Sequence, residues 1–148
     1  MKYQPKNKEE LQALCRDESV YLGDIDTSLI TDMSYLFQKS ERKDFEGIEE
    51  WDTFNVTNMK GMFSFAKAFN QNINNWNVSK VEDMSYMFKA CDSFNQPLDK
   101  WDTKKLKTMF GMFDFAKGYN SFDSLSNWDL SKVSEMSNLC FGRYEEFL

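Results

Sequence analysis

Four tryptophans recur at nearly constant intervals, and this spacing constrains the fold more than any other feature. They are separated by 25, 25 and 27 residues and are Trp51, Trp76, Trp101 and Trp128. A large apolar residue that returns every ~20–50 residues is typical of repeat proteins, in which each repeat packs on its neighbours. The spacing therefore predicts an array of stacked repeats.

The residues between the tryptophans keep the same register. With each tryptophan counted as repeat position 0, methionine recurs at position 8, methionine or leucine at position 11, and an aromatic residue followed by asparagine at positions 18 and 19. An aliphatic residue stands three places before each tryptophan, and an earlier, degenerate copy has Ile25 at position 0. We therefore trace five copies over residues 23–140, of which the first and the last are degenerate.

The apolar positions within one copy predict a short helix and a short strand. In the second copy the apolar residues are spaced by three and four over residues 56–66, which favours one face of a helical or 3₁₀ segment. Residues 69–78 place apolar residues between polar ones, as a strand does. One such unit is too small to bury its own apolar face, so neighbours must stack. We expect an α/β fold, a solenoid of strand-plus-short-helix coils with a parallel sheet.

The first 22 residues do not follow the repeat and are expected to form a helical N-terminal cap. Asn7 and Glu10 have the spacing of a capping box, and Leu11, Leu14 and Cys15 follow as an apolar stripe. Residues 23–140 form the repeat array. Residues 141–148 are either a C-terminal cap or the stub of a longer array.

Charge and composition exclude several classes of function. Eighteen basic residues against 24 acidic ones give a net charge of −6, which repels phosphate backbones, so nucleic acid is not an expected partner. The chain has no histidine, which removes Ser-His, Cys-His and imidazole-zinc chemistry. A glycosidase-type carboxylate pair needs a cleft, whereas the carboxylates here follow the repeat register or variable positions. We expect no enzymatic activity and no cofactor.

The start of the chain and its cysteines indicate a location. Residues 1–8 are charged and polar, without the apolar stretch of a secretory signal, and no window of about 18 apolar residues predicts a membrane span. Three cysteines without CxxC spacing suit free thiols in a reducing compartment; they are Cys15, Cys91 and Cys140. The sequence as written predicts a cytoplasmic protein. A cell-surface or secreted location is the alternative if a leader was removed.

An acidic or amide residue follows the boundary residue of every copy. These residues are Asp26, Asp52, Asn77, Asp102 and Asp129. Short Asx side chains accept hydrogen bonds from turn amides, and this is the favoured interpretation of the column. The alternative is a calcium site, with Asp24 and Asp32 near the start as further ligands. No EF-hand spacing and no glycine-rich calcium repeat occurs, so no metal ligand is assigned.

Two consecutive segments resemble a known family. Phe69-Asn-Gln-Asn-Ile-Asn-Asn-Trp-Asn-Val-Ser-Lys-Val-Glu-Asp-Met-Ser-Tyr-Met-Phe88 and Phe94-Asn-Gln-Pro-Leu-Asp-Lys-Trp-Asp102 are similar to repeats of the BspA-like leucine-rich-repeat surface protein family, which includes mycoplasma-type lipoprotein repeats. The resemblance covers about residues 23–140. It implies a leucine-rich-repeat-like solenoid without catalysis that binds other proteins or host surfaces. The motif itself assigns no binding residue.

Candidate binding residues are aromatics at positions that vary between copies. Such residues are free of an obvious core role, and exposed aromatics are common anchors of protein contacts. We select Phe65 and Phe115, which share repeat position 14, together with Tyr35, Tyr86, Phe54 and Phe110. The alternative is that they fill gaps in a thin core. A lysine column at position 4 (Lys80, Lys105 and Lys132) is interpreted as a solvated edge.

These features together predict a non-enzymatic protein-interaction module that acts as a monomer on a protein partner. The competing prediction is a secreted or surface-exposed adhesin-type binding protein stabilised by calcium. The two differ in whether removal of calcium changes the thermal midpoint.

Overall fold

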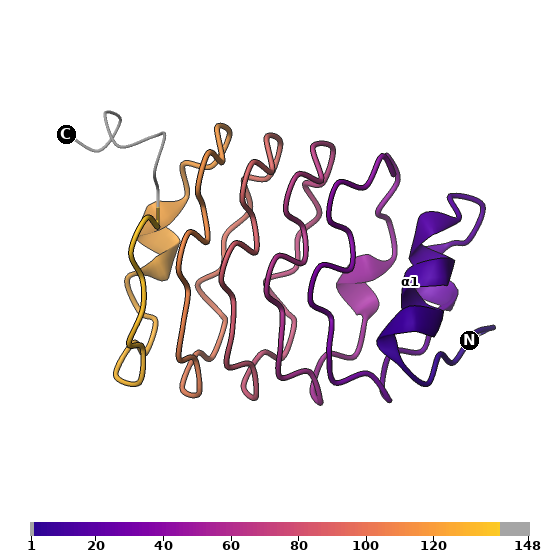
Figure 1. Ribbon diagram of the computed structural model, residues 1–148, viewed down its shortest axis with the longest axis horizontal. Coiled ribbons are helices and arrows are strands. Elements are labelled where there is room, and N and C mark those ends of the chain that lie inside the picture. Colours follow the sequence, from indigo (N-terminus) through magenta and orange to yellow (C-terminus); the bar gives the residue numbers. More distant parts are fainter. Residues whose placement is uncertain (1, 140–148) are drawn as a thin grey trace.

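The computed structural model describes residues 2–139, and it shows a chain that winds into successive coils stacked along the long axis of the molecule (Figure 1). Cys140 and the expected C-terminal segment 141–148 lie outside the described residues. The helical elements are α1 (Lys8–Arg16) and the short 3₁₀ helices η1 (Leu22–Asp24), η2 (Ile48–Glu50) and η3 (Phe122–Leu125). None of the helices of residues 2–139 is long and apolar enough to cross a membrane.

The predicted fold class is wrong. Residues 2–139 contain no sheet, so the chain is not an α/β, leucine-rich-repeat-like solenoid with a parallel sheet. Coils meet instead through isolated parallel bridges at repeat position 7; the bridged residues are Asp32, Asn58, Asp83, Thr108 and Glu135. The segment 69–78, predicted as a strand, forms no bridge, and the segment 56–66, predicted as helical, is made of turns and carries a bridge.

Backbone N–H groups that alternate between two partners explain the difference. At repeat positions 8, 10, 12 and 14 they donate to the next coil, as Gly61 does to the carbonyl of Ser85 at 2.8 Å. At positions 11, 13 and 15 they donate three residues back, as Met62 does to Met59 at 3.2 Å. The backward bonds produce the helix-like spacing of three and four. Because every second N–H group of this segment donates its hydrogen bond to the neighbouring coil, the segment forms neither a helix nor a continuous sheet ladder.

Two aromatic ladders fill the interior of the stack. At repeat position 12, Phe63 lies between Phe37 and Phe88, with ring centroids 5.5 and 5.8 Å away. A second ladder at position 18 joins Phe94 to Tyr119 at 5.6 Å. Offset ring stacking of this kind adds about 0.5–1.5 kcal/mol per pair beyond burial. Each coil therefore supplies the packing surface of the next.

The tryptophans form the boundary column that their spacing indicates. Each indole Nε1 donates to the carbonyl of an aliphatic residue in the preceding coil, as Trp76 does to Ile48 and Trp101 to Ile73, both at 3.0 Å. All four are buried, and the register read from the sequence is confirmed. The indole thus fills the core and also gives a second donor to a carbonyl that already accepts a backbone N–H three residues further along the chain.

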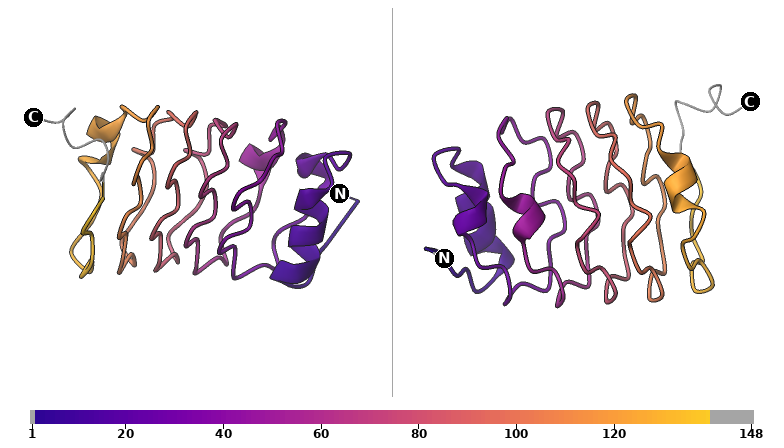
Figure 2. Two further views of the ribbon diagram at one scale, coloured as in Figure 1. Left: turned by 45° about the horizontal axis from the view of Figure 1, so that its top comes forward. Right: turned by 180° about the vertical axis from the view of Figure 1, so that it is seen from behind.

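The N-terminal helix covers the first coil (Figure 2). The predicted N-cap is confirmed, because the side chain of Asn7 accepts the N–H of Glu10 at 2.9 Å. Leu11 and Cys15 are the buried residues of this helix. Arg42, also buried, donates to carbonyls of residues 15, 17, 20 and 44 and so ties the C-terminal end of α1 to the first coil.

The recurring polar residues cap turns. In the position 1 column, Asp52 Oδ1 accepts the N–H of Phe54 at 3.0 Å, and Asp129 Oδ1 accepts that of Ser131 at 2.9 Å. The asparagines at position 19 connect coils, since Asn95 N–H donates to Asn70 Oδ1 at 2.9 Å. These contacts match the interpretation of the column as turn caps.

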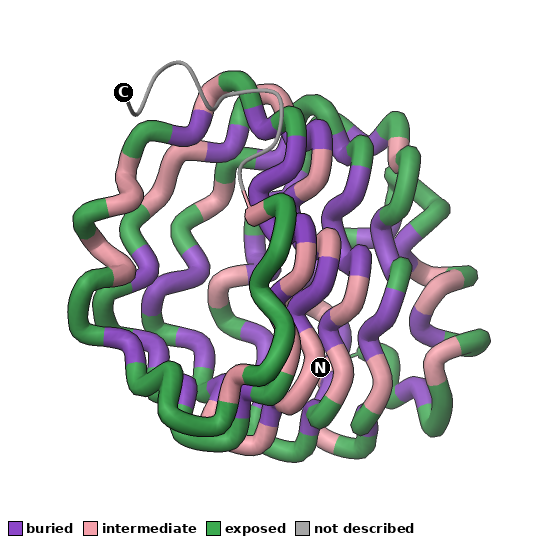
Figure 3. The backbone as a smooth tube through the Cα atoms, turned by 60° about the vertical axis from the view of Figure 1, so that its left-hand side comes forward, coloured by how far each residue is buried: buried purple, intermediate pink, exposed green. Residues whose placement is uncertain are grey.

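The last described coil is the least covered part of the stack (Figure 3). Met136 is 42% exposed, although the methionines at the same repeat position in the preceding coils are at most 2% exposed. No further coil packs on Met136 within residues 2–139, and this accounts for the contrast.

Candidate binding surface

Alternate residues of the paired segment point away from the core, and their backbone conformation is unusual. Repeat positions 10 and 14 have positive φ values in every coil that the structure describes. Position 10 holds Tyr35, Gly61, Tyr86, Gly111 and Asn138, and position 14 holds Lys39, Phe65, Ala90 and Phe115. The left-handed conformation costs a non-glycine residue roughly 1–2 kcal/mol. The fold therefore favours glycine at positions where this chain places several aromatics.

Tyr35 and Tyr86 each lie over the glycine of the next coil. A Cβ atom added to Gly61 would collide with the Tyr35 ring, and one added to Gly111 would lie 2.7 Å from Cε1 of Tyr86. The alternation of tyrosine and glycine at position 10 is thus a packing arrangement. These two rings have a structural role as well as an exposed edge.

Phe65 is an exposed aromatic residue at position 14 of the second copy. Its φ is 61° and its side chain is 36% exposed. The backbone N–H donates to the carbonyl of Lys89 at 2.8 Å, as the repeat requires, but within residues 2–139 no aromatic ring stacks on that of Phe65. The ring therefore belongs to neither aromatic ladder, although the backbone that carries it is in the left-handed region.

Two depressions meet at Phe65. The smaller, of about 160 Å³, is lined by Tyr35, Gln38, Ser64, Phe65, Tyr86 and Lys89. The larger, of about 740 Å³, is lined by Glu18, Lys39, Ser40, Glu41, Arg42, Lys43, Phe65, Lys67 and Ala68. We call the residues of both depressions the Phe65 surface.

The Phe65 surface carries the opposite charge to the whole chain. Its lining includes five cations and two carboxylates, whereas the chain has a net charge of −6. Lys67 pairs with Asp92 at 3.5 Å, and Lys89 lies 4.0 Å from Asp114. Neither Lys39 nor Lys43 forms an ion pair with another described residue. Two ammonium groups beside Phe65 are therefore free to meet an external anion.

The structure brings most of the predicted binding residues together. Tyr35, Phe65 and Tyr86 line one depression, and Phe110 packs edge-on against Tyr86 at 5.2 Å. Phe115 is exposed in the same column as Phe65 but lines neither depression.

Phe54 lies outside the Phe65 surface. Its side chain is 45% exposed, and the ammonium of Lys80 sits 4.0 Å from the ring centroid. A cation over an aromatic face is a local stabilising contact. Phe54 is therefore a matched control for Phe65 on another part of the molecule.

Lys39 and Lys43 are among the members of the surface that sequence reasoning missed. Both fall in the altered middle of the first copy, where the register is degenerate. Lys39 does occupy position 14, so its alignment with Phe65 and Phe115 was the available signal.

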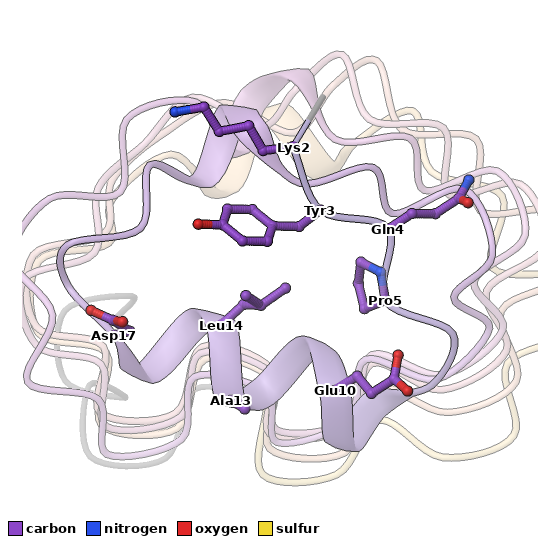
Figure 4. Close-up of a pocket in the computed structure, with 8 residues that line it drawn as sticks. All are labelled: Lys2, Tyr3, Gln4, Pro5, Glu10, Ala13, Leu14 and Asp17. Atoms are coloured by element: carbon purple, nitrogen blue, oxygen red, sulfur yellow. The ribbon is translucent and has the colours of Figure 1, made fainter.

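A separate depression of about 520 Å³ lies between residues 2–5 and α1, with Tyr3 and Leu14 pointing into it (Figure 4). Its polar side chains are already engaged: Gln4 donates to Asp26, and Glu10 accepts the N–H of Lys6. Asp17 accepts from Ser19. Because these polar groups already form hydrogen bonds with neighbouring residues, we interpret the space as a packing gap next to α1 and not as a binding site.

The thiols are poorly suited to chemistry. Cys15 and Cys91 are free and buried, and burial raises the pKa of both thiols above the usual value. A thiol held in its neutral form is a weak nucleophile. No group of three acidic or cysteine residues in the described part of the chain is placed to hold a metal ion. What the Phe65 surface offers is apolar contact and positive charge.

Comparison with curated proteins and with solved structures finds no match. Residues 31–147 match the family described as "Mycoplasma protein of unknown function, DUF285". This match confirms the mycoplasma part of the resemblance seen in the repeats, while the BspA-like leucine-rich-repeat part has no such support. Because the match spans well over half of the sequence, the chain belongs to this Mycoplasma family.

Proposed function

We propose that the protein is a non-enzymatic binding module that contacts another protein through the Phe65 surface. The observation that carries this proposal is the Phe65 ring itself. It is bulky, exposed, and held where the backbone favours glycine. Strained residues of this kind cluster at functional sites.

Burial offsets only part of the free energy that folding loses by holding Phe65 in its left-handed conformation. The left-handed backbone costs roughly 1–2 kcal/mol for a residue with a side chain. A core aromatic offsets such a cost by burial and stacking, but the ring of Phe65 remains exposed by about a third. A partner that covers the ring would bury its exposed part, and this burial would offset the remaining cost.

The shape of the surface favours a protein over a small molecule. A small-molecule site encloses most of its ligand in a concave pocket, whereas the Phe65 surface is a pair of open depressions on the outside of the stack. Aromatic anchors surrounded by polar residues are typical of protein interfaces. The BspA-like resemblance is not needed for this proposal.

The test compares three versions of the immobilised protein in affinity capture from cells, quantified by mass spectrometry. Phe65→Asn removes the ring and suits the left-handed backbone, since asparagine tolerates that conformation. Phe54→Asn is the matched control. We expect at least one protein to be captured by the wild type and the control and lost with Phe65→Asn. Equal capture by all three would contradict the proposal.

A further inference from the structure

We infer that the partner presents an acidic segment, in which a large apolar side chain is flanked by aspartate or glutamate, to the larger depression of the Phe65 surface. This inference rests on the proposed function and adds the chemistry of the partner. The apolar side chain would lie against Phe65 and Ala68, and the carboxylates would reach Lys39 and Lys43. All four residues line the same depression.

The lining of the larger depression includes apolar groups. The exposed ring of Phe65 and the methyl group of Ala68 are among them. The lysine side chains of the lining also present methylene groups, which cover apolar surface while the ammonium stays in water. A space of about 740 Å³ accommodates one large side chain together with its flanking backbone.

Several charged side chains of the depression already have partners within the protein. Arg42 donates to four backbone carbonyls, and the carboxylate of Glu18 accepts the N–H of Lys43 at 2.8 Å. Lys67 is paired with Asp92. Lys39 and Lys43 keep exposed ammonium groups with no carboxylate partner among the described residues. A partner with carboxylates complements the groups that remain free.

The net charge of the whole chain does not oppose this inference. Charges more than about 8 Å away are largely screened at physiological ionic strength, so the lysines of the depression dominate the field at the contact. An anionic membrane would face the rest of the acidic surface over a much wider area. A short acidic segment meets only the depression.

The first experiment selects phage-displayed random dodecapeptides on the wild-type protein and removes those that also bind Phe65→Asn. We expect the remaining peptides to be enriched in one large apolar residue flanked by aspartate or glutamate. Enrichment of neutral or basic peptides would overturn the inference while leaving the proposed function standing. Failure to select any peptide that depends on Phe65 would overturn both.

The second experiment measures the affinity of a selected acidic peptide for charge-reversal variants. Lys39→Glu with Lys43→Glu should weaken binding by about tenfold or more, because two attractive contacts become repulsive. Lys105→Glu with Lys132→Glu makes the same change of net charge at exposed lysines outside the depression, and it should have less than about a twofold effect. Equal weakening by both pairs would show that only net charge matters and would overturn the inference.

Vesicles containing phosphatidylserine test the membrane as an alternative occupant. We expect no binding that depends on Phe65. Binding to these vesicles that is lost with Phe65→Asn, without a matching effect on the acidic peptide, would assign the surface to lipid and overturn the inference.

Discussion

Phe63 and Phe65 are the same residue type, two places apart in one coil, yet they have opposite roles. Phe63 is fully buried and stacks on rings of the coils on either side. Phe65 is 36% exposed and has a left-handed backbone. Both N–H groups donate to the next coil, to Met87 and Lys89 respectively. The same backbone ladder therefore carries an inner row that stabilises the stack and an outer row that is free to vary.

The outer row makes no contribution of its side chains to the backbone ladder. Because the ladder is made by backbone groups, it does not depend on the side chains at repeat positions 10 and 14. Glycine occupies position 10 in two coils, so the ladder itself requires no side chain there. Tyr35 and Tyr86 pack over the glycines of the next coil, whereas Phe65 belongs to neither aromatic ladder.

The largest effect is expected from the tryptophan column. Trp76→Ala should lower the free energy of unfolding by about 3–5 kcal/mol, because a buried ring is lost and the carbonyl of Ile48 loses one of its two donors. Urea unfolding followed by circular dichroism measures the change. A variant with the wild-type midpoint would contradict the stacking of the coils.

Removal of the Arg42 side chain should be nearly as costly. Arg42→Met leaves the carbonyls of Cys15, Asp17, Val20 and Asp44 without their guanidinium donor. We expect a loss on the order of 3 kcal/mol, since buried acceptors without partners are expensive. Hydrogen exchange should show α1 losing protection first. Uniform exchange throughout the chain would contradict the conclusion that Arg42 links α1 to the first coil.

A smaller effect should result from crowding the outer row. Gly61→Ala forces a side chain into a backbone with φ 61° and pushes its Cβ against the Tyr35 ring, at a cost of about 1–3 kcal/mol. Tyr35→Ala removes the obstacle, so the double variant should lose less than the sum of the two single variants. Strict additivity in this double-mutant cycle would contradict the tyrosine-over-glycine packing.

The smallest effect concerns the turn caps in acid. Hydrogen bonds from Ser131 hold the pKa of Asp129 below its usual value, and those from Ser28 do the same for Asp26. A folded-state pKa below that of the unfolded chain means that unfolding takes up protons in acid. These caps therefore stabilise the fold above the usual carboxyl pKa of about 4, and their contribution disappears as the pH falls through the lower folded-state value.

Asp129→Asn tests this, since Asn77 already caps the equivalent turn with an amide that does not titrate. The variant should lose less thermal stability than the wild type between about pH 7 and about pH 3. An identical loss in both proteins would show that the Asp129 cap does not contribute.

The repeat register was predictable from the sequence, but the backbone conformation was not. The tryptophan spacing correctly placed Met59, Phe63 and Phe69 in the core, because burial follows the register whatever the local structure. The spacing of three and four was interpreted as a helix, since a row of turns with bonds three residues back produces the same pattern. The left-handed residues at positions 10 and 14 interrupt that helix, and only the recurring Gly61 and Gly111 indicated them.

The candidate surface was partly predictable for a related reason. Tyr35, Phe65 and Tyr86 were found because they vary at fixed repeat positions, and they do line one depression. Phe54 satisfied the same criterion but lies elsewhere, because variability marks an outward residue without indicating which outer face it occupies. Lys39 shares repeat position 14 with Phe65, but only the fold of the irregular first coil shows that Lys43 lines the same depression.

The most direct test of the account is the free energy of unfolding of Phe65→Gly beside that of Phe63→Ala, measured in urea. The account predicts that Phe65→Gly is unchanged or more stable by up to about 1 kcal/mol, because glycine relieves the left-handed backbone, while Phe63→Ala loses about 3–5 kcal/mol. A loss of more than about 1 kcal/mol in Phe65→Gly would show that the ring belongs to the fold, and the division into an inner and an outer row would be wrong.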